Sequence, residues 1–162
     1  MVGVRISKRR YANPPAAAFD GEGSRRRGGR WTRPGLRVAY APSSLALAQL
    51  EYFVNLSPQD APDDLVLIVV EIAEGLRIEE LSRSVLPAAW HRTPFPEELW
   101  TFGDHWLASA NSVCLRVPSA VSQEDFNLLI NPGHPDFKLL GFSPARLFEF
   151  DPRMWKGSKI GR

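Results

Sequence analysis

The sequence predicts an α+β domain whose mixed sheet is mostly antiparallel. Short β-branched or alternating runs recur along the chain, as expected of strands. Helical segments lie between some of these runs, but without the regular strand–helix–strand spacing of a parallel sheet. The 162 residues are enough for one domain with a substantial core. We therefore expect residues 1–155 to form this domain and residues 156–162 to be a frayed tail.

The first quarter of the chain combines two short strands with a basic loop. Residues 4–7 and 36–40 are predicted as strands, the second ending at Tyr40. Between them, residues 19–31 contain four glycines and four arginines. Glycines let the backbone approach a ligand closely, and guanidinium groups bind phosphate oxygens in pairs. We interpret this segment as a loop that is either simply solvated or holds a phosphate-bearing ligand.

An apolar helix is expected from Leu45, because a serine precedes it and can cap its first turn. Glu51 is the only charged side chain in residues 38–59. It follows Leu47 by four residues and borders the apolar face that Leu47 shares with Leu50. A carboxylate in this position either forms an ion pair that anchors the helix or acts on a bound ligand.

The middle of the chain alternates between strand, irregular and helical segments. Residues 64–71 form the clearest buried strand, because they are almost all apolar and rich in β-branched side chains. Residues 78–81 are expected to form one helical turn. Residues 86–96 contain three prolines and are expected to be irregular. Residues 97–110 have the apolar spacing of a helix.

Strands are expected to complete the sheet toward the C-terminus. Residues 113–117 are predicted as a strand that ends just before Ser119, and residues 127–131 as the next. Residues 137–142 and 147–150 are expected to pair with each other as a closing antiparallel pair.

Charge is distributed unevenly along the chain. Residues 1–37 carry ten lysines and arginines against Asp20 and Glu22, which gives this part a net charge of +8. The remainder has ten basic and sixteen acidic residues and a net charge of −6. A cationic segment on a mildly acidic body indicates a polyanionic partner, either a nucleic acid or a phosphate-bearing small molecule.

Several kinds of site are excluded by what the sequence lacks. The single Cys114 permits no internal disulfide, and with three scattered histidines it makes no zinc site. No Walker pattern, dinucleotide fingerprint or G-x-S-x-G elbow is present. No apolar run reaches membrane-spanning length, and we expect no secretory signal. The remaining candidates are a carboxylate, arginines, a tyrosine and a serine, a set that suits a cationic transition state.

Five segments follow one another in a recognisable order: residues 28–31 (GGRW), 38–40 (VAY), 45–51 (LALAQLE), 116–120 (RVPSA) and 127–137 (NLLINPGHPDF). Together they resemble the motifs of the RES-domain family, the toxins of RES–Xre toxin–antitoxin pairs of bacteria. The resemblance covers nearly the whole chain, and several motifs in the right order are more specific than any one of them.

The resemblance implies a fold related to ADP-ribosyltransferases and a reaction that uses NAD as a substrate, with no bound cofactor. Members of the family cleave the nicotinamide–ribose bond and pass ADP-ribose to water, phosphate or a protein. Two residues would be catalytic, Glu51 and Arg30. The residues that would bind NAD are Arg5, Arg30, Tyr40, Ser119 and Asn55.

Elementary chemistry agrees with these assignments. Cleavage of the nicotinamide bond develops oxocarbenium character on the ribose, which a carboxylate such as Glu51 stabilises. The choice between Arg5 and Arg30 as the main arginine stays open. Asn55 stands where many members have a histidine, and it cannot shuttle protons at neutral pH.

The resemblance also implies partners and a location. A cognate Xre-type antitoxin would inhibit the toxin in a complex, within which toxin chains could also pair. The toxin would act in the cytoplasm, away from membranes, and would meet nucleic acid only through the antitoxin.

Two alternatives to NAD degradation remain. The same residues would serve an ADP-ribosyltransferase that modifies a specific protein. From another class, the arginine-rich N-terminus could belong to a module that binds nucleic acid or cleaves RNA.

Overall fold

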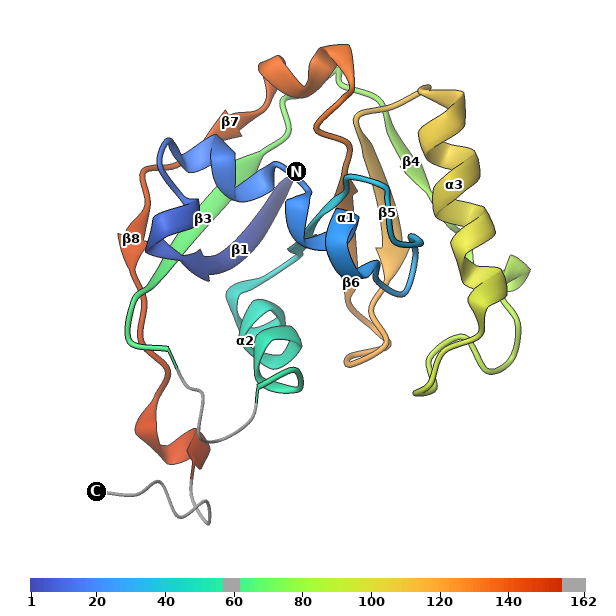
Figure 1. Cartoon of the computed structure of the whole chain (residues 1–162). Coiled ribbons are helices and arrows are strands. Elements are labelled where there is room, and N and C mark those ends of the chain that lie inside the picture. Colours follow the sequence, from blue (N-terminus) through green and yellow to red (C-terminus); the bar gives the residue numbers. More distant parts are fainter. Residues whose placement is uncertain (57–61, 156–162) are drawn as a thin grey trace.

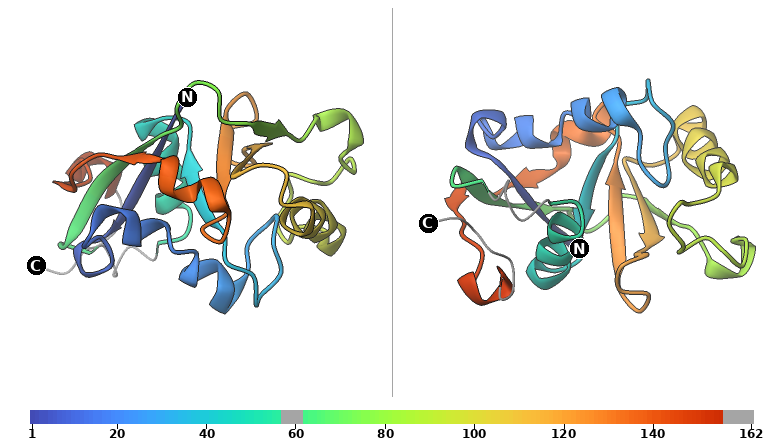
Figure 2. Two further views of the ribbon diagram at one scale, coloured as in Figure 1. Left: turned by 90° about the horizontal axis from the view of Figure 1, so that it is seen from above. Right: turned by 60° about the horizontal axis from the view of Figure 1, so that its bottom comes forward.

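Two four-stranded sheets lie side by side in the computed structural model of the protein, which describes residues 1–56 and 62–155 (Figure 1). Helices and short 3-10 turns cover their outer surfaces, as the two further views show (Figure 2). The expected α+β class with mixed, mostly antiparallel pairing is confirmed, with the strands divided between two sheets. The tail expected at residues 156–162 lies outside the described residues.

The first sheet is built on β3 (Leu65–Glu71), which pairs with β1 (Val2–Lys8) along one edge. Along its other edge β3 pairs with both β7 (Gly141–Phe142) and β8 (Arg146–Leu147). All of these pairings are antiparallel. The expectation that residues 137–142 and 147–150 pair with each other was therefore wrong. β3 is long enough for the returning chain to bind along one edge in two pieces.

The second sheet has the order β2 (Ala39–Pro42), β6 (Phe126–Ile130), β5 (Cys114–Pro118) and β4 (Ile78–Glu80). Its pairings are antiparallel except for β4 on β5, which is parallel. The helical turn expected at residues 78–81 was wrong. The open edge of β5 offers these residues hydrogen-bond partners that an isolated helical turn would lack.

Helix α1 (Glu22–Arg27) forms where a loop was expected. Glu22 forms ion pairs with Arg25 (2.7 Å) and Arg26 (2.8 Å), which lie one turn further along the helix. Gly28 follows the helix with φ of 70°, a conformation that favours glycine. Local ion pairs thus stabilise a short helix, and Gly28 ends it, in a segment whose sequence predicts a flexible loop.

Helices α2 (Leu45–Phe53) and α3 (Trp100–Ser109) form as expected. The Ser44 hydroxyl caps α2 by accepting a hydrogen bond from the Leu47 backbone nitrogen (3.1 Å). None of the helices in residues 1–56 and 62–155 has the length and apolar character needed to cross a bilayer. The 3-10 turns are η1 (Arg9–Tyr11), η2 (Pro15–Phe19), η4 (Arg83–Val85), η5 (Glu97–Leu99), η6 (Pro135–Leu139) and η7 (Pro152–Trp155).

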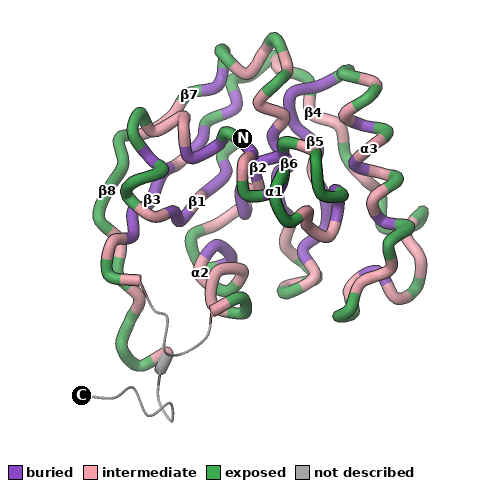
Figure 3. Tube along the Cα trace, viewed as in Figure 1, coloured by how far each residue is buried: buried purple, intermediate pink, exposed green. Residues whose placement is uncertain are grey.

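Burial follows the strands and the inner faces of the helices (Figure 3). Ala48 of α2 packs against Val4 and other apolar residues of β1 and β3. Leu47 is 1% exposed but Leu50 is 41% exposed, so the predicted apolar face of α2 is narrower than expected. Helix α2 is therefore fixed on the first sheet, while Glu51 extends to the second.

Candidate active site

The carboxylate of Glu51 links α2 to the ends of two strands of the second sheet. The Ser119 hydroxyl donates a hydrogen bond to its Oε1 atom at 2.8 Å. The Asn127 side-chain amide donates to the same Oε1 atom, also at 2.8 Å. Within the described residues, Oε2 accepts no hydrogen bond. One carboxylate oxygen is thus held and the other is available to a ligand.

Ser119 follows β5 and is completely buried. Its hydroxyl oxygen accepts hydrogen bonds from the backbone nitrogens of Val121 (3.2 Å) and Ser122 (3.3 Å). A hydroxyl has one proton to donate, and here that proton goes to Glu51. The hydroxyl is therefore fully used within the protein.

Tyr40 extends from β2 toward the glycine- and arginine-rich segment. Its hydroxyl accepts a hydrogen bond from the Trp31 backbone nitrogen and lies within hydrogen-bond distance of the Thr32 hydroxyl, both at 3.3 Å. A Cβ atom added at Gly29 would lie 2.6 Å from the Tyr40 hydroxyl oxygen, so glycine permits this close packing. Burial raises the pKa of Tyr40, which keeps the phenol protonated at neutral pH.

Arg30 turns toward the irregular segment before α3. Its Nη1 atom donates to the backbone oxygens of Trp90 (2.6 Å) and Arg92 (2.9 Å). The guanidinium also lies over the ring of Phe95, 5.1 Å from the ring centroid. Burial lowers the pKa of Arg30, and the charge of Glu51 opposes this shift. Arg30 is thus electrostatically coupled to Glu51, and its hydrogen bonds hold the irregular segment around Trp90 and Arg92 in place.

Arg5 bridges the two sheets. From β1 its Nη1 atom donates to the backbone oxygen of Tyr40 in β2 (2.9 Å), and its guanidinium carbon lies 5.8 Å from the ring centroid of Phe19. Its Nε atom is buried without a hydrogen-bond partner in the described structure. Burial lowers the pKa of Arg5, and the charge of Asp20 opposes this shift. A buried guanidinium with an unused donor is suited to an anionic ligand.

A cavity of about 260 Å³ lies beside Arg5 and is bounded by β1, η1, η2 and α1. Arg26 and Arg27 line it as well, together with the carboxylates of Asp20 and Glu22. Arg26 is paired with Glu22, whereas Arg27 has no hydrogen-bond or ion-pair partner among the described residues. Arg5 and Arg27 therefore leave net positive charge in the cavity.

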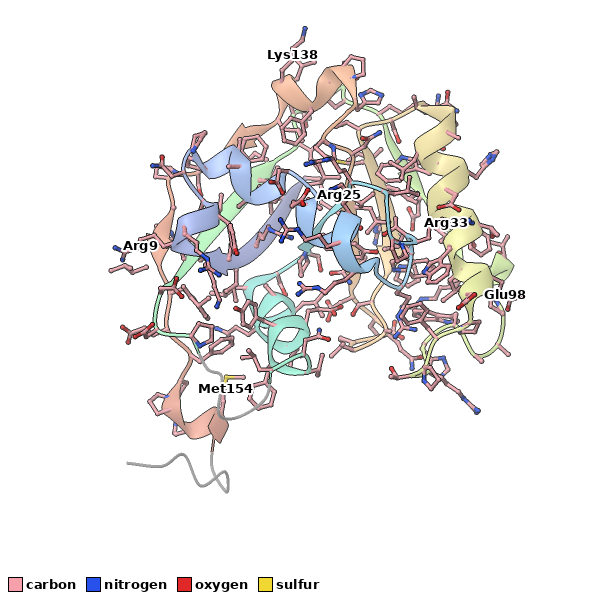
Figure 4. All side chains as sticks on the ribbon, viewed as in Figure 1. Arg9, Arg25, Arg33, Glu98, Lys138 and Met154 are labelled. Carbon is pink, nitrogen blue, oxygen red and sulfur yellow. The ribbon has the colours of Figure 1, made fainter. Side chains whose placement is uncertain are left out.

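Other arginines of the basic segment have structural partners. Arg25, which Figure 4 shows on α1, pairs with Glu22 at 2.7 Å. Arg33, beside α3 in the same view, pairs with Asp104 at 2.5 Å. Ion pairs within the protein thus neutralise part of the N-terminal positive charge, and only some of the arginines line the cavity.

Asn55 lies just after α2. Its side-chain amide donates to the backbone oxygen of Glu51 at 2.8 Å, one turn earlier. The amide therefore satisfies a carbonyl at the end of the helix. The part of the chain that the structure describes has no group of three or more His, Cys, Asp or Glu side chains placed to hold a metal ion.

A family model described as the RES domain matches residues 3–151. The chain belongs to the RES-domain family. A Prs ADP-ribosylating toxin of Sphingobium sp. (strain YBL2) is 37% identical over 138 residues, which cover 84% of this chain and 86% of that protein. A toxin Res of Yersinia enterocolitica is 36% identical over 155 residues, which cover 95% and 99% of the two chains.

The fold of this RES domain also matches a solved structure. It superposes on a chain of the crystal structure of the M. tuberculosis MbcT–MbcA toxin–antitoxin complex with a TM-score of 0.69. The match covers 96% of this chain and 86% of that chain at 16% identity. At this identity the likeness supports the shared fold.

Sequence reasoning missed Asn127 in the RES domain. Residues 127–131 were predicted as a strand and residues 127–137 as a family motif, but the side chain of Asn127 was not singled out. Asn127 is only 6% exposed and donates to Glu51. A polar residue at the start of an otherwise apolar buried strand was the available signal.

Proposed function

We propose that this RES-domain protein is the toxin of a bacterial toxin–antitoxin pair and consumes NAD. It would cleave the nicotinamide–ribose bond and pass ADP-ribose to water or phosphate. The observation that carries the proposal is the Glu51 carboxylate, held at one oxygen and available at the other. The name of the Prs ADP-ribosylating relative supports the same reaction class, and the name of the toxin Res relative supports the toxin role.

Glu51 would act on the ribose. In NAD the nicotinamide ring nitrogen is cationic, so nicotinamide leaves as a neutral molecule and needs no general acid. The bond between this nitrogen and ribose C1′ breaks, and its electron pair stays on nicotinamide. Positive charge then spreads over C1′ and the ring oxygen. The ionised Glu51 would stabilise that charge and accept a hydrogen bond from a ribose hydroxyl.

The second half of the reaction forms a bond from C1′ to an oxygen of the acceptor. With water the products are ADP-ribose and a proton. With phosphate the product is an ADP-ribose phosphate ester. Glu51 would serve as the base that receives the proton of an attacking water.

Arg5 would bind the pyrophosphate. Its side chain lines the cationic cavity, and its Nε proton has no acceptor in the described structure. Arg27 would add a second cation there. Tyr40 would border the nicotinamide or ribose, because its ring lies between the strand end and the glycine segment. Arg30 and Asn55 would act by fixing the loop and the end of α2, and Ser119 by fixing Glu51.

The decisive experiment measures NAD consumption by purified wild-type protein and by the isosteric Glu51→Gln variant. We expect release of nicotinamide by the wild type and a loss of about 10²-fold or more in the variant. Product identification with and without added phosphate distinguishes hydrolysis from phosphorolysis. Wild-type turnover by a folded Glu51→Gln protein would rule out the mechanism.

A second candidate is transfer of ADP-ribose to a specific protein. It is favoured by the 37% identity to the Prs ADP-ribosylating toxin. Both reactions use the same Glu51 chemistry and differ only in the acceptor. Incubation of the protein with labelled NAD and cell lysate separates them, since a labelled protein band indicates transfer and free ADP-ribose indicates degradation.

The partner would be a cognate antitoxin of the Xre type. The similar fold in a toxin–antitoxin complex supports an antitoxin as such. Because unrestrained NAD loss would poison the producing cell, an inhibitor that covers the cationic cavity is expected. An acidic segment would complement the arginines there. We place the activity in the cytoplasm, where a buried free thiol such as Cys114 is stable.

Direct binding of nucleic acid is the less favoured alternative. Arg25, Arg26 and Arg37 all pair with Glu22, so these arginines do not form an open strip for a phosphate backbone. A salt-dependent gel shift without NAD turnover would favour it.

A further inference from the structure

We infer that Asn127 and Ser119 are positioning residues that fix the Glu51 carboxylate for the reaction. Together they hold Oε1 and aim Oε2 at the ribose. The inference rests on the proposed function and adds to it a role for Asn127 and a reassigned role for Ser119.

The geometry restricts the carboxylate from two strands. Ser119 lies after β5 and Asn127 lies in β6, where Val117 is its register partner across the ladder. Both donate to the same oxygen at 2.8 Å. Two donors on one oxygen fix the rotation of a carboxylate and leave the second oxygen without a protein partner among the described residues. Such an arrangement suits a group that must meet a ligand in one orientation.

Both donors are themselves restrained by burial. Asn127 is 6% exposed and Ser119 is completely buried. The Ser119 hydroxyl already accepts two backbone hydrogen bonds, from Val121 and Ser122. Its proton and both lone pairs are used, so it has no capacity left for NAD while it donates to Glu51.

Glu51 and its two donors come from parts of the fold that belong to different sheets. Helix α2 packs on the first sheet through residues such as Ala48, whereas both donors belong to the second sheet. The position of Glu51 therefore depends on both sheets. Removal of one donor would let the carboxylate turn without disturbing the packing of α2.

Asn127 has a further unused atom. Its Oδ1 is buried and accepts no hydrogen bond in the described structure. The amide is therefore retained at a cost, because a buried carbonyl oxygen without a partner is unfavourable. An apolar side chain would avoid that cost, which indicates that the Nδ2 donor to Glu51 is what the position requires.

The test compares Asn127→Leu and Ser119→Ala with wild type. For each we expect kcat to fall about 10- to 100-fold, because small misplacements of a catalytic group have effects of this size. Affinity for a carbocyclic NAD analogue, whose nicotinamide bond does not cleave, should change less than about threefold, because Glu51 acts mainly in the transition state. Unchanged kcat, or a loss confined to affinity, would overturn the inference.

Asn127→Asp provides a signature that a purely structural role would not produce. Its carboxyl and that of Glu51 would lie within hydrogen-bond distance and share one proton at low pH, so that a donor to Glu51 is restored. We expect partial activity at acidic pH that falls as pH rises and this proton is lost. Arg30 and Tyr40 are electrostatically coupled to Glu51, and both keep their protons at neutral pH. A pH profile parallel to that of wild type would contradict the inference.

Two controls separate the possible failures. Asn131 lies just past the C-terminal end of β6, and its Oδ1 atom accepts a hydrogen bond from the Gly133 backbone nitrogen (2.9 Å). The control variant Asn131→Asp should leave turnover unchanged. Glu51→Gln reports on the proposed function itself. If it is inactive while Asn127→Leu keeps the wild-type rate, the positioning role fails and the proposed function stands. If the wild type consumes no NAD, the proposed function fails first.

Discussion

The guanidinium of Arg5 donates a hydrogen bond to the backbone oxygen of Tyr40 at 2.9 Å and thereby joins the edge strands of two separate sheets. The same side chain lines the cationic cavity. One residue thus contributes both to the relative position of the sheets and to the positive charge of the cavity. Burial lowers the pKa of this guanidinium, and its hydrogen bond to Tyr40 offsets part of the cost of burying the charge.

Arg5→Lys should weaken NAD binding. A lysine keeps the charge but cannot bind Tyr40 and two phosphate oxygens together, since it lacks the planar fork of arginine. We expect affinity for the carbocyclic NAD analogue to fall about 10-fold, as measured by calorimetry, which corresponds to about 1.4 kcal/mol. Arg9→Lys, at the exposed position that Figure 4 labels, is the matched control and should bind normally. Equal affinities in the two variants would show that Arg5 does not contact the ligand.

Gly29→Ala and Tyr40→Phe should be energetically coupled. The added Cβ would lie 2.6 Å from the Tyr40 hydroxyl oxygen, so alanine should displace the tyrosine or the segment around it. Removal of that oxygen relieves the closest contact, although Cζ remains 3.0 Å away. Denaturant unfolding of both single variants and the double variant should give a coupling of about 1 kcal/mol. Additive effects would mean that the two groups do not meet in solution.

The ion pairs of Glu22 should make stability depend on pH in the acid range. Hydrogen bonds from Arg25 and Arg26 lower the pKa of Glu22 to about 2. A lowered folded-state pKa adds stability above the unfolded-state pKa, near 4.3, which is lost as pH falls toward 2. The Tm of wild type should therefore fall more steeply between these values than that of Glu22→Gln. Because the group is partly exposed to solvent, the difference should shrink in high salt, and parallel curves at low salt would contradict the assignment.

The sequence predicted strands and helices best where one apolar pattern dominates locally. β3, α2 and α3 were found, and the family motifs located Glu51 and Ser119. Helix α1 was missed because its stability comes from ion pairs, including one from Arg37 (2.9 Å), and no apolar stripe marks it. Strand β4 was missed because only its pairing with β5 makes it a strand.

The site shows the same division. Tyr40 and Glu51 could be chosen by residue type and motif, but the two donors to the Glu51 carboxylate lie far away in sequence. The donor from Asn127 to Glu51 spans 76 residues, and no local pattern reports such a contact. The different partners of Arg5 and Arg30 were likewise not predictable, since neither the strand around Arg5 nor the glycine-rich segment around Arg30 indicates what its guanidinium contacts. Packing of the two sheets decides which guanidinium faces the cavity and which holds a loop.

Arg30→Met should loosen the loop before α3 more than it weakens ligand binding. The variant keeps an unbranched stem but removes the donors to the Trp90 and Arg92 backbone oxygens. Amide hydrogen exchange in residues 86–96 should therefore become faster, because local opening of this loop no longer has to break those hydrogen bonds and costs less free energy. Affinity for the carbocyclic NAD analogue should fall less than in Arg5→Lys. If exchange is unchanged and affinity falls further than in Arg5→Lys, Arg30 and not Arg5 is the arginine that holds the ligand.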